Sequence, residues 1–166
     1  MDIVVITVPS PAHAGQFREL IERRRVHGLY PREVDFRVYC DPPAGRIGSG
    51  GSTLMTLSDL LRDCGGGDPI EFFSRKKILV IHAGGESRRM PCYAPECKLF
   101  APMPVASSSI IPPVVLDMQL SLFLKFPWKT GEVIVSSGDV VIDFDTAMVP
   151  DDRGDVCGCA KPASLA

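Results

Sequence analysis

The chain has 166 residues, enough for one domain with a buried core, and 45% of them are hydrophobic while 23% are charged. The net charge of −2 excludes the basic excess of a nucleic-acid-binding protein, and no apolar run is long enough to cross a membrane. No cationic segment precedes the first apolar run, so we expect no signal peptide and a cytoplasmic protein with reduced cysteines.

Apolar patterning predicts alternating strands and helices from the first residues onward. Residues 3–8 form a continuous β-branched run, which is typical of a buried strand. A helix is expected over 12–26, with Pro11 in its first turn and Gly28 just past its end. A second strand is expected over 36–39.

The rest of the chain continues this alternation. It predicts a helix over about 52–64, a strand over 77–82, a helix over 114–126, a strand over 132–136 and a further short strand over 140–144. Such an order favours an α/β fold in which helices flank a largely parallel sheet.

A glycine-rich loop, residues 45–53, follows the second predicted strand. Glycines let a ligand approach the backbone, and free N–H groups before a helix form a cradle for anions. The residues expected to bind a nucleotide here are Gly48, Ser49, Gly50, Gly51, Ser52 and Thr53. Ser52 or Thr53 can also cap the helix, and a turn with only that capping role is the alternative. The loop lacks the lysine of a Walker A motif and matches a dinucleotide fingerprint only at its start.

A second glycine-rich turn follows the strand predicted over 77–82. Its candidate nucleotide-binding residues are Gly84, Gly85, Ser87 and Arg88, and its candidate catalytic residues are Arg89 and the downstream Lys98. Ligands bind at the carboxyl ends of strands in such sheets, and nucleotidyl transfer needs in-line positioning with cations over the developing charge. Surface charge without function is the alternative for an arginine pair, but the position directly after a strand favours a phosphate site.

Candidate metal ligands lie just after the strand predicted over 132–136. Asp139, in Ser-Ser-Gly-Asp, offers an oxygen ligand of the kind that magnesium prefers, and turn capping is its alternative role. Asp143 and Asp145 form a rival pair, because alternate residues of a strand share a face.

The six cysteines include two close pairs. Cys92 and Cys97 are separated by four residues, and Cys157 and Cys159 by one. Neither spacing is that of a CxxC zinc site, so we interpret the cysteines as small apolar side chains, with zinc binding as the alternative.

Together these segments resemble the sugar-nucleotide pyrophosphorylases, which carry an AGGxGxR motif followed by a lysine after a proline-containing loop. Residues 83–89 match this motif, with Arg89 and Lys98 in the arginine and lysine positions and Ser87 in place of a glycine. HAGGESRRMPCYAPECKLFAPMPV, with DPPAGRIGSGGST upstream and SSGDVVI downstream, is similar to fucose-1-phosphate guanylyltransferases and to the corresponding half of bifunctional fucokinase/guanylyltransferases.

The resemblance implies a nucleotidyltransferase fold of the glycosyltransferase-A type, which is Rossmann-like with a mixed, mostly parallel sheet. It implies transfer of GMP from GTP to L-fucose 1-phosphate with Mg²⁺, giving GDP-L-fucose and pyrophosphate. In that reading residues 48–53 and 84–88 hold the nucleotide, Arg89 and Lys98 stabilise the transition state, and Asp139 binds the metal.

The resemblance also bears on the extent of the domain. Because members of that family are much longer, we expect residues 1–166 to be the N-terminal part of such a domain, completed by a C-terminal portion or a partner chain. Another sugar-1-phosphate nucleotidyltransferase and a non-catalytic nucleotide-binding module are the two alternative functions.

Overall fold

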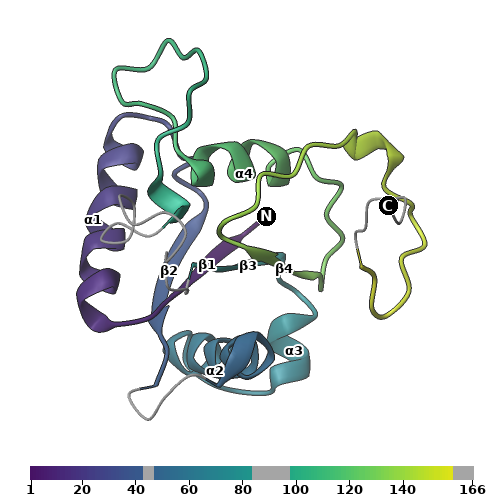
Figure 1. The fold of residues 1–166 in the computed structure, drawn as a ribbon. Helices are drawn as coiled ribbons and strands as arrows, with labels where there is room; N and C mark the ends of the chain where they lie inside the picture. The colour runs from purple at the N-terminus through teal and green to yellow at the C-terminus, as the bar shows by residue number, and fades with distance from the viewer. Residues whose placement is uncertain (43–46, 84–97, 159–166) are drawn as a thin grey trace, which may run out of the picture.

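The computed structural model describes residues 1–42, 47–83 and 98–158 (Figure 1). Four strands form one sheet in the order β2-β1-β3-β4. Their bounds are β1 Ile3–Val8, β2 Asp35–Cys40, β3 Ile78–His82 and β4 Val133–Ser137. All three pairings are parallel, so the predicted α/β fold with a largely parallel sheet is confirmed.

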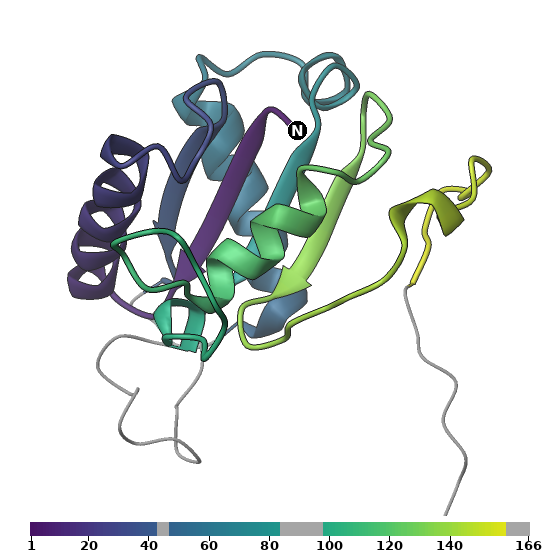
Figure 2. The same ribbon diagram turned by 90° about the horizontal axis from the view of Figure 1, so that it is seen from above.

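Helices cover both faces of the sheet. α1 (Pro11–Val26) and α4 (Val115–Phe123) pack on one face, and α2 (Gly48–Asp63) and α3 (Pro69–Phe73) pack on the other. Figure 2 looks down on the first face, with α4 in front of the sheet and α2 behind it. No helix of the described ranges has both the length and the apolar character needed to cross a bilayer.

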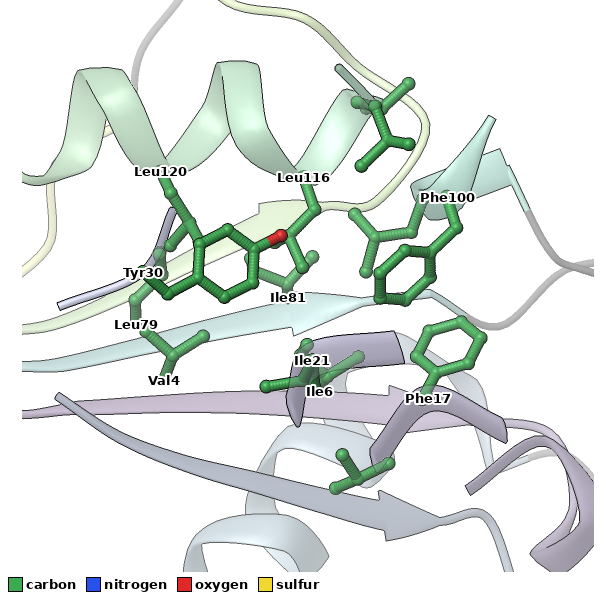
Figure 3. Close-up of a cluster of buried hydrophobic side chains, with 14 of the residues drawn as sticks. Val4, Ile6, Phe17, Ile21, Tyr30, Leu79, Ile81, Phe100, Leu116 and Leu120 are labelled. Carbon is green, nitrogen blue, oxygen red and sulfur yellow. The ribbon is translucent and has the colours of Figure 1, made fainter. Parts of the chain in front are cut away.

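Alternate residues of the central strands feed two cores. Val4 and Ile6 of β1 join the larger core under α1 and α4, where Phe17 meets Phe100 edge to face (Figure 3). Ile3 and Val5 point to the other face, toward Leu60 of α2. Because both faces are covered, β1 reads as an unbroken apolar run rather than an alternating one.

The bounds of α1 follow its local chemistry. The Ser10 hydroxyl accepts a hydrogen bond from the His13 N–H, and Pro11 occupies the first turn, where its missing N–H costs nothing. Gly28 follows the helix with φ +71°, a left-handed conformation that glycine adopts without strain. The predicted start and end of this helix are therefore confirmed.

Two local predictions are wrong, and one short helix was missed. The glycine-rich loop predicted over 45–53 is helical from Gly48 onward, where α2 begins. Residues 140–144 form no strand, and Val140 and Val141 are about half exposed with no neighbouring strand to pair with in the described sheet. The short helix α3 was not predicted, although Asp68 caps it through the Ile70 N–H and Pro69 begins it.

A buried polar network joins α1, α4 and the loop before β2. Asp117 Oδ1 accepts hydrogen bonds from Tyr30 Oη at 2.6 Å and from Arg24 Nε at 3.2 Å. Asp117 Oδ2 accepts from the Val114 N–H at the start of α4. Burial, together with the neighbouring Asp117 carboxylate, raises the pKa of Tyr30 well above its usual value. The network ties the two helices of this face to each other.

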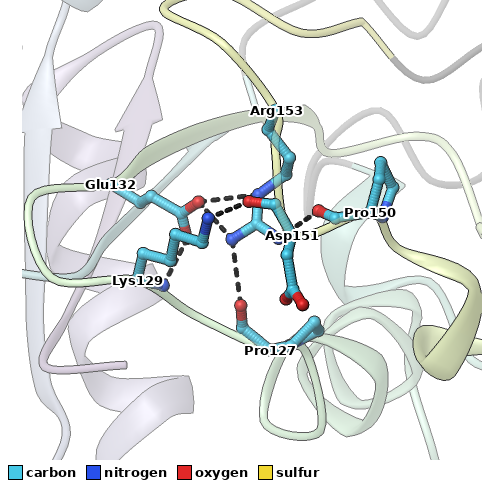
Figure 4. Close-up of polar contacts among 6 residues, drawn as sticks. All are labelled: Pro127, Lys129, Glu132, Pro150, Asp151 and Arg153. Carbon is cyan, nitrogen blue, oxygen red and sulfur yellow. Dashed lines mark hydrogen bonds and ion pairs between the residues drawn. The ribbon is translucent and has the colours of Figure 1, made fainter.

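The segment after β4 folds back onto the loop before that strand (Figure 4). Arg153 pairs with Glu132 and also donates to the carbonyls of Pro127 and Pro150, at 3.0 and 2.9 Å. Lys129 donates to the carbonyl of Asp151. These contacts lie at the amino-terminal end of β4, which begins one residue after Glu132.

Candidate functional site

The parallel sheet places the ends of all four strands along one edge. Register pairs Val8 with Cys40, Thr7 with His82, and His82 with Ser137. The segments that leave β2, β3 and β4 therefore start side by side, where α/β proteins bind ligands. The phosphate-binding segments predicted from the sequence can share one site only if the strand ends are arranged in this way.

His82, the last residue of β3, joins three elements at this edge. Its Nδ1 lies 2.9 Å from Thr7 Oγ1 of β1, and its Nε2 lies 2.8 Å from Thr53 Oγ1 of α2. Thr53 Oγ1 donates its own hydrogen bond to the Ser49 carbonyl, at 2.9 Å. It must therefore accept from Nε2–H, which leaves Nδ1 to accept from Thr7. The two hydroxyls fix the imidazole and bind the start of α2 to the centre of the sheet.

The first turn of α2 faces this edge with its backbone exposed. Gly48, Ser49 and Gly50 are exposed, and the first N–H groups of a helix have no partner within it. The N-cap position is Ile47, which makes no side-chain capping bond, so the prediction that Ser52 or Thr53 caps the helix is wrong. Ser52 is buried and donates instead to Asp41 Oδ1 at 2.9 Å. The arrangement leaves the start of α2 exposed, as at helix termini that bind anions, while the Ser52 and Thr53 hydroxyls are bonded to other residues.

The structure brings two predicted site residues into direct contact. Lys98 Nζ donates to Asp139 Oδ2 at 2.9 Å, and Ser137 Oγ donates to Asp139 Oδ1 at 2.6 Å. The hydrogen bond from Ser137 and then that from Lys98 lower the pKa of Asp139 below its usual value. Lys98 begins a short 3-10 helix, η2 (Lys98–Phe100), whose next two residues are buried in the core. The pair is thus held by packing on one side and by β4 on the other.

Gly138 allows β4 to end close against β3. Its N–H donates to the His82 carbonyl at 2.8 Å. A Cβ at this position would lie 2.9 Å from that same oxygen and 3.0 Å from the Ala83 Cα. The glycine in Ser-Gly-Asp is therefore required by the approach of the two strand ends, and it places Asp139 beside the exit of β3.

The remaining predicted site residues are distributed as follows. Gly84, Gly85, Ser87, Arg88 and Arg89 lie outside the described residues, as do Cys92, Cys97 and Cys159. Asp145 caps a second 3-10 helix, η3 (Thr146–Met148), through the Ala147 N–H at 2.9 Å. Asp143 and Asp145 consequently share no strand face, and the rival metal pair loses its basis. Within the described ranges, no three His, Cys, Asp or Glu residues cluster in a way that could hold a metal.

Asp139 has the properties of a single-carboxylate magnesium ligand. Its side chain is 45% exposed, hydrogen bonds from Ser137 and Lys98 lower its pKa, and a hydroxyl oxygen lies beside it. Magnesium keeps several waters and is commonly bound by one or two carboxylates plus substrate phosphates. The residues present therefore fit such an ion without a preformed protein cage.

Sequence reasoning missed Asp41, His82 and Gln119. Gln119 is 1% exposed on α4, and its Nε2 donates to the carbonyls of Ser137 and Val140. The available signal was its position: an amide on the otherwise apolar stripe of Leu116 and Leu120. His82 directly precedes a glycine motif, but its partners depend on strand register.

The environment of His82 predicts a dependence of stability on pH. Burial lowers the pKa of His82, and the Asp41 charge only partly opposes that shift. A lowered folded-state pKa means that the neutral ring contributes stability above the unfolded-state pKa, and this is lost as the pH falls through the folded-state value. We expect the unfolding free energy of the protein to fall more steeply between about pH 7 and 5 than that of His82→Gln, since the unperturbed pKa of His is about 6.5.

Urea unfolding at a series of pH values would measure this difference. His13→Gln serves as the control, because His13 lies near the start of α1 and contacts Ser10 only locally. Parallel pH curves for the protein and His82→Gln would show that the ring is not held neutral by its surroundings.

Comparison with known proteins places these features in context. The family model for the fucose pyrophosphorylase domain matches residues 70–166. A Mus musculus protein named fucose-1-phosphate guanylyltransferase is 29% identical over 171 residues, which covers 99% of this chain and 27% of the mouse protein. The Homo sapiens protein of the same name is also 29% identical, over 99% of this chain and 26% of its own length.

A relative with a second activity in its name is similarly distant. The Arabidopsis thaliana bifunctional fucokinase/GDP-fucose pyrophosphorylase is 28% identical over 93% of this chain and 17% of its own length. The chain thus spans about a quarter of the mouse and human relatives and less of the plant protein. No solved structure matches the chain.

Proposed function

Since the chain belongs to the fucose pyrophosphorylase family, we propose that it provides the nucleotide-binding part of an enzyme that transfers GMP from GTP to L-fucose 1-phosphate. The names of its mouse and human relatives support this substrate pair. The observation that carries the proposal is the convergence, at one edge of the sheet, of the α2 terminus, His82 and the Lys98–Asp139 pair.

In the proposed reaction an oxygen of fucose 1-phosphate attacks the α-phosphorus of GTP. A new P–O bond forms, the bond from the α-phosphorus to the bridging oxygen breaks, and its electron pair leaves with pyrophosphate. Such a transfer depends on in-line positioning and on positive charge at the phosphate oxygens. The products are GDP-L-fucose and pyrophosphate.

We assign the nucleotide to residues 48–53, together with Gly84, Gly85, Ser87 and Arg88. The exposed start of α2 supports this assignment, because its free N–H groups and dipole favour phosphate. Ser52 and Thr53 would act by fixing the helix rather than by direct contact, since their hydroxyls are bonded to Asp41 and to His82 and Ser49.

We assign the transition-state charge to Lys98 and Arg89, and the magnesium ion to Asp139. The Lys98 ammonium lies at the end of β4 and is about one-third exposed, so it can turn toward a phosphate. A magnesium ion bound there would neutralise charge on the triphosphate. Asp139 would hold the magnesium ion through its carboxylate, which in this structure accepts a hydrogen bond from Lys98.

Calorimetric titration tests this function directly. We expect GTP to bind to the chain more tightly with Mg²⁺ than with EDTA, and more tightly than UTP or ATP does. Equal affinity for the three nucleotides would point to another sugar-1-phosphate nucleotidyltransferase. No heat with either GTP or fucose 1-phosphate would contradict the assignment as a whole.

A further inference from the structure

Gln119 is the one fully buried polar side chain of α4 that reaches the strand end carrying Asp139. It lies on the core-facing side of the helix between Leu116 and Leu120, and all three are almost completely buried. Its Nε2 donates to the Ser137 carbonyl at 2.7 Å and to the Val140 carbonyl at 2.5 Å. The amide thus bridges the two residues that flank Gly138 and Asp139.

The orientation of this amide is set by its partners. A backbone carbonyl can only accept, so both contacts require the NH₂ end of the side chain. The Oε1 end has no hydrogen-bond partner among the described residues. A buried unpaired acceptor is unfavourable, and leucine or methionine would fill the same space without it. The two bonds to the turn, rather than core packing, account for an amide at this position.

These bonds act on the same turn as two others already described. The Gly138 N–H is bonded to the His82 carbonyl, and the Asp139 carboxylate is bonded to the Ser137 hydroxyl. Gln119 holds the turn from the α4 side, while His82 holds it from the β3 side. The backbone of the turn is thus held from both sides, and the Asp139 carboxylate is bonded to Ser137 and Lys98.

We propose that Gln119 is a positioning residue that holds the Ser137–Val140 turn so that Asp139 presents its carboxylate to the cation of the bound nucleotide. The proposal rests on the function proposed above for Asp139. Residues that orient a metal ligand typically change metal affinity about 10–100-fold when they are removed. The effect is therefore expected in magnesium dependence rather than in nucleotide binding as such.

The test compares Gln119→Met with Leu116→Met, a control of the same kind on the same buried face of α4. The measured quantity is the Mg²⁺ concentration that gives half-maximal GTP binding. We expect Gln119→Met to raise it about 10–100-fold and Leu116→Met to leave it within about twofold, with GTP affinity in EDTA unchanged for both. Equal values for the two variants would overturn the proposal while leaving the proposed function standing. A wild-type chain without magnesium dependence would overturn both.

A second comparison separates positioning from general loosening of the fold. In an Asp139→Asn background, Gln119→Met should have no further effect on magnesium dependence, because the ligand that it orients is already gone. Additive effects would contradict the proposal. Should Gln119→Met fail to fold, Gln119→Asn keeps the amide but withdraws it from both carbonyls, and the same shift is expected.

Discussion

Lys98→Ala is expected to lower kcat for GDP-fucose formation by about 10²–10³-fold, the usual effect of removing one group that stabilises developing negative charge. GTP affinity should change little, because the backbone N–H groups at the start of α2 remain in place. Pyrophosphate release measures kcat, and calorimetry measures GTP binding. The two readouts together distinguish loss of catalysis from loss of substrate.

Lys125→Ala is the matched control for this variant. Lys125 is exposed just beyond the end of α4. Its replacement should leave both readouts unchanged. Equal kcat values for Lys98→Ala and Lys125→Ala would remove Lys98 from the catalytic machinery, and a parallel loss of GTP affinity would make it a binding residue instead.

Asp117→Ala is expected to lower the free energy of unfolding by about 3–5 kcal/mol, the range found when one partner of a buried ion pair is removed. The Arg24 side chain is only 6% exposed and would be left without its carboxylate. The Tyr30 hydroxyl and the Val114 N–H would lose their acceptor as well. A loss of this size is a large part of the 5–15 kcal/mol that is typical of a folded domain.

Urea unfolding of Asp117→Ala beside Glu19→Ala checks this expectation. Glu19 pairs with Arg23 on the surface of α1, where the two side chains are 65% and 67% exposed. Breaking such a pair costs at most about 1 kcal/mol. A similar loss for both variants would mean that the buried network contributes no more than a surface ion pair does.

The two central strands, β1 and β3, were predictable because burial on both faces leaves a clear, mostly apolar run. Residues 3–8 and 77–82 were placed within one residue, and α1 was found from Pro11 and Gly28. The early start of α2 was not predictable from its glycines, which disfavour helix interiors. Contacts with other elements decide it: Ser52 is buried and donates to Asp41, and Thr53 is bonded to His82 of β3.

The site was predictable as a set of segments but not as a set of contacts. Lys98 and Asp139 were chosen from separate motifs, and their direct bond across 41 positions depends both on the β3–β4 pairing and on the packing of η2 into the core. His82 and Gln119 act through register and helix placement, which no local pattern records. Residues whose role is to touch a neighbouring strand are therefore the ones that sequence reasoning misses.

If a metal–triphosphate complex binds here as proposed, the bond between Lys98 and Asp139 would make its entry an exchange of partners. The Lys98 and Asp139 side chains are 32% and 45% exposed, and each is held in place by the other. The complex carries both a cation for the carboxylate and an anion for the ammonium. The single Lys98–Asp139 contact would then be replaced by two contacts with the ligand. A lone cation could pair only with the Asp139 carboxylate, and a lone anion only with the Lys98 ammonium. Either one would leave the other side chain without a partner of opposite charge. On the proposed function, we therefore expect the metal and the triphosphate to bind here together.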